Sequence, residues 1–224
     1  MPNTKILFTI TSVADLAFPP REGGYAKGHE TRELILKAAL ELLIEEGFRS
    51  LSMRRVAAAC GMKLGNLTYH FPTREDLIQA LLDAVISSYE IEFERIVHIP
   101  GVAPDKRLLA YCRLVLEDIR SKKTSHFFPE VWALSIHDSF VAEWMQELYA
   151  RARRPLEEII EEIRPDLPSA KRNDLALFIS ASMEGLTVFA GHNRAFEPRM
   201  PIYEAIAARS FVDLVQTIRE EDIP

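Results

Sequence analysis

Residues 52–71 read SMRRVAAACGMKLGNLTYHF and are followed directly by PTREDL at 72–77. The wider window 49–74 contains no Asp or Glu, whereas five of its side chains are basic: Arg49, Arg54, Arg55, Lys63 and Arg74. The chain of 224 residues has a net charge of −6, so the rest of it carries −11. Charge segregated in this way indicates a partner that is itself an anion, although an ordinary solvated face has the same pattern.

This stretch predicts two short helices joined by a tight turn. Ser52 is a good N-cap for a helix over 53–60, and Gly61 suits the C-cap of that helix. About three turn residues then lead to a helix over 64–71, which Pro72 ends. Glycine at the turn between two short helices is typical of the helix-turn-helix motif, whose second helix lies in the major groove of DNA.

The helix over 64–71 is predicted to have an inward apolar side and an outward polar side. Leu67 and Phe71, at i and i+4, are predicted to anchor it to the rest of the domain. Gly65 lets a phosphodiester approach the backbone, and outward polar groups can bind phosphates or base edges. The predicted DNA-binding residues are Ser52, Arg54, Arg55, Lys63, Gly65, Asn66, Thr68, Tyr69 and His70.

The remainder of the chain has helical periodicity and no convincing alternation of period two. A helix precedes the motif and ends at Gly47, and Thr73 with Asp76 opens a long helix from Arg74 to about Val97. Further helices are predicted at about 105–121, 126–137, 140–163, 169–192 and 202–220. The expected fold is therefore all-α, with about nine helices.

The segment from about Thr31 to Leu81 resembles the DNA-binding domain of the TetR family of transcriptional regulators, and the run GMKLGNLTYHFPTREDL at 61–77 matches its third helix and the start of its fourth. The resemblance implies a homodimer that represses transcription from a palindromic operator and is released by a small-molecule effector. Two positions depart from the family pattern. Lys63 stands where Ser or Thr usually caps the recognition helix, and Thr68 stands where Tyr is common.

Three parts of the chain are expected: a flexible arm over 1–26, the helix-turn-helix domain over 27–75, and an effector-binding and dimerisation domain over 76–224. The amino-terminal stretch is interrupted by polar residues and lacks an A-x-A-like cleavage site, so a signal peptide is not expected. Two cysteines form no disulfide framework, which fits a reducing compartment. No apolar run is long enough to cross a membrane, and a cytoplasmic location is expected.

The helices over 169–192 and 202–220 are predicted to form the dimer interface. Small residues in the first helix permit close helix packing, and two such helices from each subunit resemble the four-helix interface of the family. The alternative is that these helices form the hydrophobic centre of a monomeric bundle.

Polar and aromatic groups in the middle helices are the candidates for effector contacts, because small-molecule sites combine apolar walls with a few polar groups. They are Tyr111, Arg113, Trp132, His137, Trp144 and Glu184. An aromatic residue at helical spacing is also an ordinary core residue, and a histidine near a helix end is also a surface group. Glu184 is the only charge in a long apolar run, where it can pair with a cationic effector or bond across the dimer.

The sequence does not predict an enzyme, because it contains no metalloprotease, di-iron, nucleophile-elbow or P-loop motif. Glu94 and His98, at i and i+4, are two ligands at most, so neither a metal nor a cofactor is expected. Two alternatives remain open: an architectural DNA-binding protein without a ligand, and a helical metalloenzyme. The first predicts weak sequence preference and a steep dependence of binding on salt.

Overall fold

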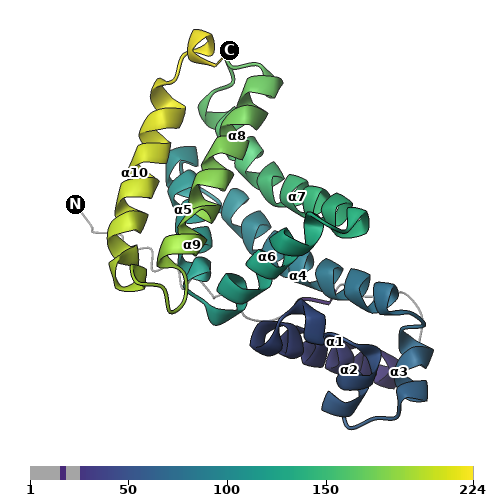
Figure 1. Ribbon diagram of the computed structural model, residues 1–224. Coiled ribbons are helices and arrows are strands. Elements are labelled where there is room, and N and C mark those ends of the chain that lie inside the picture. The colour runs from purple at the N-terminus through teal and green to yellow at the C-terminus, as the bar shows by residue number, and fades with distance from the viewer. Residues whose placement is uncertain (1–15, 19–25, 224) are drawn as a thin grey trace.

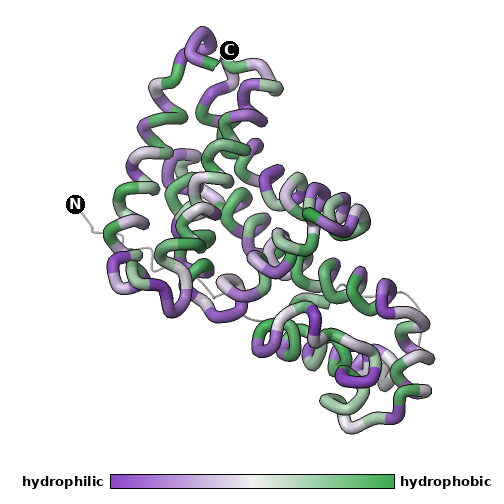
Figure 2. Tube along the Cα trace, in the orientation of Figure 1, coloured by the Kyte–Doolittle hydropathy of each residue, from purple (hydrophilic) through white to green (hydrophobic). Residues whose placement is uncertain are grey.

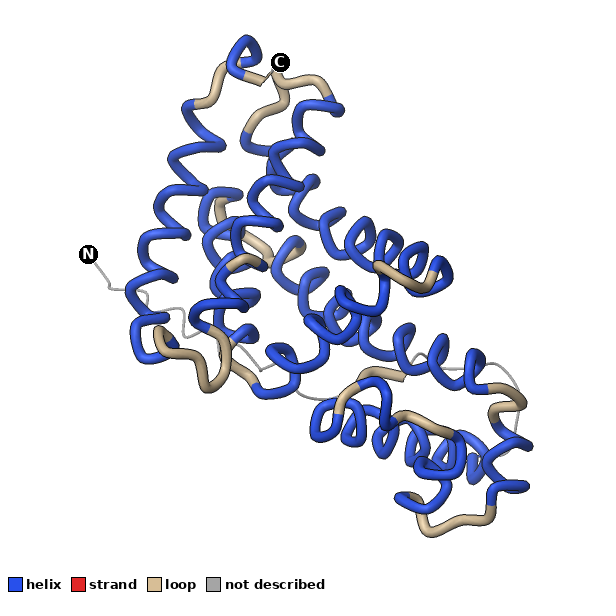
Figure 3. Tube along the Cα trace, viewed as in Figure 1, coloured by secondary structure: helices blue, strands red, loops and turns tan. Residues whose placement is uncertain are grey.

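The structure, a computed structural model, describes residues 16–18 and 26–223. In this part of the chain all regular structure is helical, which confirms the prediction of an all-α fold (Figure 3). The α-helices are α1 (Ala26–Glu46), α2 (Met53–Ala59), α3 (Leu64–His70), α4 (Arg74–Val97), α5 (Pro104–Ile119), α6 (Lys122–Ser135), α7 (Ser139–Ile163), α8 (Ser169–Glu184), α9 (Leu186–Ala190) and α10 (Met200–Thr217). Short 3-10 turns occur at η1 (Phe48–Ser50), η2 (Glu197–Arg199) and η3 (Glu220–Asp222).

The segment predicted as one helix over 169–192 is divided between α8 and α9. Gly185 separates them, although its own backbone stays near the helical region, with φ −57° and ψ −27°. The described residues form ten α-helices, or nine if α8 and α9 are counted as one.

Local sequence explains where the helices around the opening stretch begin and end. Ser52 caps α2, and its Oγ accepts a hydrogen bond from the backbone N–H of Arg55. Gly61, at φ 63°, takes the left-handed conformation that ends α2 and that glycine adopts at little cost. Thr73 and Asp76 form a reciprocal capping box at the start of α4, as their spacing predicts.

The first three helices enclose a small core of their own. Ile35 and Leu43 of α1, Val56 of α2 and Leu67 of α3 are buried together with Phe71. These residues recur at helical spacing on one side of each helix, and hydrophobic and hydrophilic residues alternate in the same way along the other helices (Figure 2). The opposite face of α3 is thereby directed away from the protein.

The long helix α4 joins this small domain to a bundle formed by α5–α10 (Figure 1). It packs against α1 at one end and against α5 and α7 further along. In the bundle, α5 lies between α7 and α10, while α8 packs against α7. No helix of the described residues is long and apolar enough to cross a membrane.

A second junction between the two parts is made by α6, which packs against α1. His126 Nδ1 donates to the carbonyl of Ile44 at 2.9 Å, and the Glu130 carboxylate accepts from the backbone N–H of Phe48, also at 2.9 Å. Lys122 pairs with Glu45 beside them. The small domain is therefore held by side chains of α6 as well as by the continuous helix α4.

The predicted flexible arm over 1–26 falls mainly outside the described residues, which take in only 16–18 and Ala26 of it. Leu16 is buried in the core, and Lys37 of α1 lies over the ring of Phe18 at 5.8 Å. The division of the chain at 27–75 and 76–224 stays a prediction.

Candidate functional site

The outward face of α3 is exposed and polar. Lys63, Gly65, Asn66 and Tyr69 are exposed, and Tyr69 reaches 82% of its full accessibility. The Tyr69 ring meets the neighbouring His70 ring edge-on, at 5.2 Å between centroids, but at this exposure it adds little to the core and is accessible to a partner. Thr68 and His70 are half-buried on the flanks of the same face.

Two features at the start of α3 leave room for an anion. Lys63 is the N-cap residue but its side chain makes no capping hydrogen bond, so backbone N–H groups of the first turn keep no side-chain partner. A Cβ built on Gly65 would meet nothing within 4 Å, so the packing of this chain does not require glycine there. Both observations describe an accessible helix N-terminus next to a basic side chain.

The five basic residues of the window 49–74 divide into two groups. Arg55 pairs with Glu46 at 2.6 Å, and Arg74 donates to the carbonyl of Leu51. The other three, Arg49, Arg54 and Lys63, are exposed, and within the described chain no side-chain hydrogen bond or ion pair is formed by them. Their charges are accordingly available to a partner outside the protein.

Arg32 was missed by the sequence reasoning, although it supports α3 directly. Its guanidinium donates to the backbone carbonyl of His70 and lies 4.0 Å from the centre of the Phe71 ring. Burial, and then the nearby Arg32 charge, lower the pKa of His70. The imidazole is therefore neutral at neutral pH, and it is the backbone of His70 that holds the end of α3 in place.

The second candidate region is a cavity inside the bundle, between α4, α5, α6, α7 and α8. Its inner chamber has a volume of about 40 Å³ and mainly aromatic walls. Phe93 and Tyr111 stack there with their ring centres 4.6 Å apart, and Tyr89 packs edge-on against Phe128 at 5.8 Å. Tyr149 completes the set of rings.

A buried carboxylate lies in the wall of this chamber. Asp118 is only 3% exposed, and its Oδ2 accepts hydrogen bonds from the hydroxyl groups of Tyr89, at 2.6 Å, and Thr124. Its other oxygen, Oδ1, has no hydrogen-bond partner among the described residues. An acceptor left unpaired at such depth costs free energy unless something donates to it.

Glu184 reaches the same chamber from α8. Its Oε2 is also buried without a hydrogen-bond partner in the described chain. Burial raises the pKa of this carboxyl to about 7, and the neighbouring Asp118 carboxylate adds to the rise. Burial likewise raises the pKa of Tyr111 and of Tyr149, so both phenols stay protonated.

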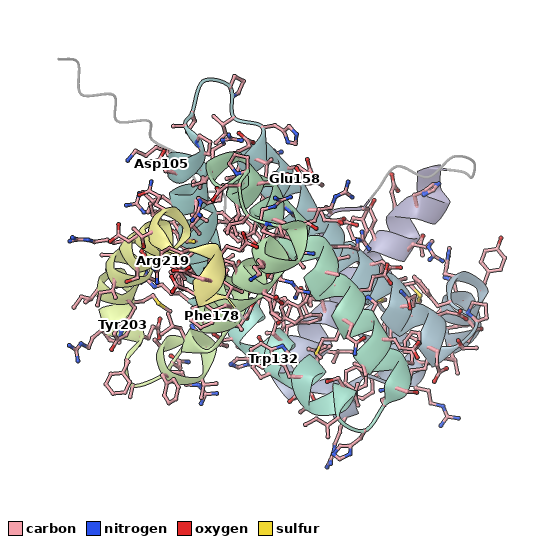
Figure 4. The ribbon with its side chains drawn as sticks, turned by 90° about the horizontal axis from the view of Figure 1, so that it is seen from above. Asp105, Trp132, Glu158, Phe178, Tyr203 and Arg219 are labelled. Carbon is pink, nitrogen blue, oxygen red and sulfur yellow. The ribbon has the colours of Figure 1, made fainter. Side chains whose placement is uncertain are left out.

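A larger and more open recess adjoins the chamber, with a volume of about 690 Å³. Tyr149, Ser180 and Glu184 line both spaces, so the chamber and the recess share a wall. Trp132, whose Nε1 donates to the Tyr149 hydroxyl at 2.8 Å, lines the recess from α6 (Figure 4). We refer to the two spaces as the inner chamber and the vestibule.

The predicted effector residues occupy three kinds of place. Tyr111 and Glu184 line the inner chamber, and Trp132 and Glu184 line the vestibule. Arg113 and His137 are exposed, and Trp144 is buried in the core; these three line neither space.

Sequence reasoning missed Tyr89, Asp118, Thr124 and Tyr149, which the fold brings to the chamber. A signal for Asp118 was present in the sequence. It follows Tyr111 and Val115 at i+7 and i+3, which is the spacing of a buried helix face. A charged residue at such a position needs hydrogen-bond partners in the interior, which makes it a candidate site residue.

The metalloenzyme alternative finds no support in the part of the chain that the structure describes. His98 and Glu94 approach to 3.2 Å on the exposed side of α4, but no group of three or more metal-binding side chains occurs among the described residues.

Two sequence-family models match this chain. One, described as bacterial regulatory proteins of the tetR family, matches residues 35–81. The other, described as the C-terminal part of BetI-type transcriptional repressors, matches residues 104–213. Together they extend from α1 to α10.

Individual proteins with similar sequences or structures are also transcriptional regulators. An uncharacterized HTH-type transcriptional regulator from Xanthobacter autotrophicus is 27% identical over 183 residues, which is 77% of this chain and 85% of the relative. A transcriptional regulator from Pseudomonas aeruginosa has a similar structure, with a TM-score of 0.75, 17% identity and coverage of 88% of this chain and 95% of the other. A regulator from Saccharomonospora viridis in complex with choline has a TM-score of 0.61 and 18% identity, and the match covers 84% and 97% of the two chains.

The fold and the exposed face of α3 thus define a helix-turn-helix DNA-binding protein. Because the family models match both the DNA-binding and the C-terminal parts, the chain belongs to the TetR family of transcriptional regulators. Members of this family act by binding DNA and are not enzymes.

Proposed function

We propose that this protein is a homodimeric repressor that binds a palindromic operator and is released by a small molecule bound in the chamber and vestibule. The observation that carries the proposal is the pairing of two features in one chain. An exposed, polar recognition helix lies at one end of α4, and a cavity with unpaired buried acceptors lies along its other half. The choline complex of one structural neighbour supports a small molecule as the kind of ligand.

In this proposal α3 enters the major groove with Asn66 and Tyr69 toward the DNA. Lys63 binds one phosphate, which also relieves the unfavourable position of a positive charge at the positive end of the helix dipole. Arg54 binds a phosphate from α2. Ser52 acts through the N-cap of α2, and Arg55 reaches DNA only by exchanging Glu46 for a phosphate.

The proposed dimer interface is the outward face of α8, α9 and α10. Large apolar side chains are exposed there, namely Leu177, Phe178, Val188, Phe189, Ile202 and Ile206. Figure 4 labels Phe178 on α8 and Tyr203 on the neighbouring helix α10. An exposed apolar surface of this kind marks an interaction site, and a twofold axis through it matches the symmetry of a palindromic operator.

Signal transmission is assigned to α6, because its two faces serve the two functional regions. Thr124, Phe128 and Trp132, at i, i+4 and i+8, face the chamber and the vestibule. Lys122, His126 and Glu130, at the same spacing two residues earlier, face α1 and η1. A ligand that displaces α6 from the cavity side therefore displaces the contacts that orient the DNA-binding domain.

The mechanism follows as a population shift between two arrangements of the dimer. The free protein favours the arrangement whose recognition helices reach successive major grooves about one helical turn apart. The ligand favours the other arrangement, and operator DNA reciprocally weakens ligand binding. Since the partner is chromosomal DNA, we propose the cytoplasm as the place of action.

The test is selection of duplexes from a random pool by the purified protein at near-physiological salt. We expect enrichment of a palindrome with half-sites about one helical turn apart. Weak, salt-sensitive binding without enrichment, in protein refolded to remove any bound ligand, would contradict the proposal and favour an architectural DNA-binding protein.

A further inference from the structure

Resting on the proposed role of the cavity, we infer that the effector is an organic cation that carries N–H donors. Its ammonium group occupies the inner chamber between Asp118 and Glu184, and its body lies in the vestibule. The inference names the class of ligand and separates amines from quaternary ammonium compounds.

The first argument is the supply of hydrogen bonds. Asp118 Oδ1 and Glu184 Oε2 are both acceptors without a donor among the described residues, while Asp118 Oδ2 is already occupied by two hydroxyl groups. A protonated amine brings two or three N–H donors, enough to serve both free oxygens at once. A quaternary ammonium brings none.

The second argument is charge. The residues that line the inner chamber include two carboxyl groups and no Lys, Arg or His. Lys123, whose Nζ lies 5.4 Å from the centre of the Tyr89 ring, and Arg153 of the vestibule are outside this lining. An anionic ligand would therefore face the two carboxyl groups with no basic side chain in the chamber wall, at a cost that burial increases. A monovalent cation offsets one of the two negative charges. In its absence a proton on Glu184 does the same, in keeping with the raised pKa of that carboxyl.

The third argument is the wall of the chamber. Tyr89, Phe93, Tyr111, Phe128 and Tyr149 place five aromatic rings around the carboxyl groups. The electron-rich faces of such rings attract a cation, the more strongly where water is excluded. The aromatic rings and the two carboxylate oxygens without partners therefore each favour a positively charged head group.

The volumes of the two spaces indicate which part of the ligand each of them holds. A single water needs about 10–15 Å³ of such space, so the chamber of about 40 Å³ holds a small ammonium group and excludes a bulky trimethylammonium. The vestibule of about 690 Å³ lies within the range of drug-sized sites and has apolar walls from Trp132, Met145, Leu177 and Val188. Arg153 lines the vestibule too and disfavours a second cation at that end. Leu177 and Val188 also belong to the proposed dimer interface, so the partner would close this side.

The experiment compares four probes that share one body: 2-phenylethylammonium, its N,N,N-trimethyl analogue, 2-phenylethanol and 3-phenylpropionate. Binding is measured by isothermal titration calorimetry and by the shift in Tm, without DNA, at about pH 8, where Glu184 is ionised. We expect the primary amine to bind at least tenfold more tightly than each of the other three. A series from ethylammonium to 4-phenylbutylammonium varies the length of the body.

Tighter binding of the alcohol or the carboxylate would overturn the inference. If the trimethyl analogue bound as tightly as the primary amine or more tightly, the claim that the ligand needs N–H donors would be overturned. If none of the amines bound at a concentration of about 10 mM, which is far above the dissociation constants of ordinary ligands, the whole inference would be overturned.

Variants locate the site. Asp118→Asn and Glu184→Gln are each expected to weaken amine binding at least tenfold, with helicity and Tm checked first. Glu204→Gln is the matched control, because Glu204 on α10 also has a buried oxygen without a partner in the described chain but lines neither space. Unchanged amine affinity in both of the first two variants would contradict the assignment.

The two proposals fail in different ways. A protein that binds its operator but prefers the carboxylate or the alcohol refutes the inference alone. A protein that selects no operator refutes the proposed function, while the DNA-free titration still decides which head group the cavity accepts.

Discussion

At the scale of single residues, Gly65 is a position where stability and function are expected to oppose each other. A Cβ there has open space around it, so Gly65→Ala should stabilise α3 by about 0.8–1 kcal/mol through helix propensity. The same methyl would stand between the backbone and a phosphate, and operator affinity should fall several-fold. Urea unfolding and operator titration measure the two effects.

Gly191→Ala is the contrasting control, because a Cβ at Gly191 would lie 2.5 Å from Ser125 Oγ and 2.6 Å from the carbonyl oxygen of Thr187. That variant should be destabilised by about 1–3 kcal/mol, as expected for an overpacked site. Operator affinity equal to that of the wild type in Gly65→Ala would show that DNA does not approach the backbone there.

Glu184 should make stability depend on pH in a defined direction. Its pKa is 4.5 in an unperturbed carboxyl and about 7 in the folded protein, so between these values only the folded state retains the proton. Stability should therefore fall as pH rises from 4.5 to 7, by about 3 kcal/mol per subunit in total.

The charged groups near Glu184 are Asp118, which adds to the effect, and Arg153 in the vestibule, while the buried tyrosines stay neutral. Unfolding curves at fixed protein concentration over this pH range, for the wild type and Glu184→Gln, measure the difference. Parallel pH profiles for the two proteins would contradict the prediction.

At the scale of elements, α6 should transmit the signal through Glu130. Glu130→Ala leaves the N–H of Phe48 without its acceptor, at a cost of about 1–3 kcal/mol where water does not replace it. We expect faster hydrogen exchange confined to residues 47–50 and a several-fold loss of operator affinity, because the DNA-binding domain is less firmly oriented.

Glu143→Ala is the control for this experiment, since Glu143 is an exposed glutamate of α7. It should change neither exchange at 47–50 nor operator affinity. If Glu130→Ala behaved in the same way as the control, α6 would not orient the DNA-binding domain through this contact.

At the scale of the whole molecule, the dimer should depend on the apolar face of α8–α10. Phe178 is 58% exposed, so Phe178→Glu costs the isolated subunit little. In a dimer the two charges would be buried near each other across the twofold axis, which is strongly unfavourable. We expect a monomer by analytical ultracentrifugation and at least a hundredfold loss of operator affinity, because two half-sites then bind independently.

Ala170→Glu provides the comparison for Phe178→Glu, since it introduces the same single negative charge at an exposed position of α8 outside the apolar group. It should remain dimeric. A Phe178→Glu protein that also remained dimeric would exclude this face as the interface.

The helical fold and the position of the DNA-binding motif could be predicted from the sequence because both depend on local interactions. Caps at Ser52 and Thr73, the left-handed glycine at 61 and the stripe that buries Leu67 are encoded within a few residues of where they act. The exposure of Lys63 and Tyr69 follows from that same stripe, because residues opposite a buried face point outward. The sequence by itself therefore determined the fold class, the family and the outward face of α3.

Only the tertiary structure decided which polar residues of the C-terminal part meet in a cavity. Asp118, Thr124 and Glu184 lie on three different helices, and no local pattern states which faces of those helices pack together. Arg32 was missed for the same reason, since its partner His70 is 38 residues away. Local sequence sets the periodicity of each helix, whereas the rotation of one helix against another depends on packing across the whole core, and that packing placed two unpaired carboxylate oxygens within one aromatic chamber.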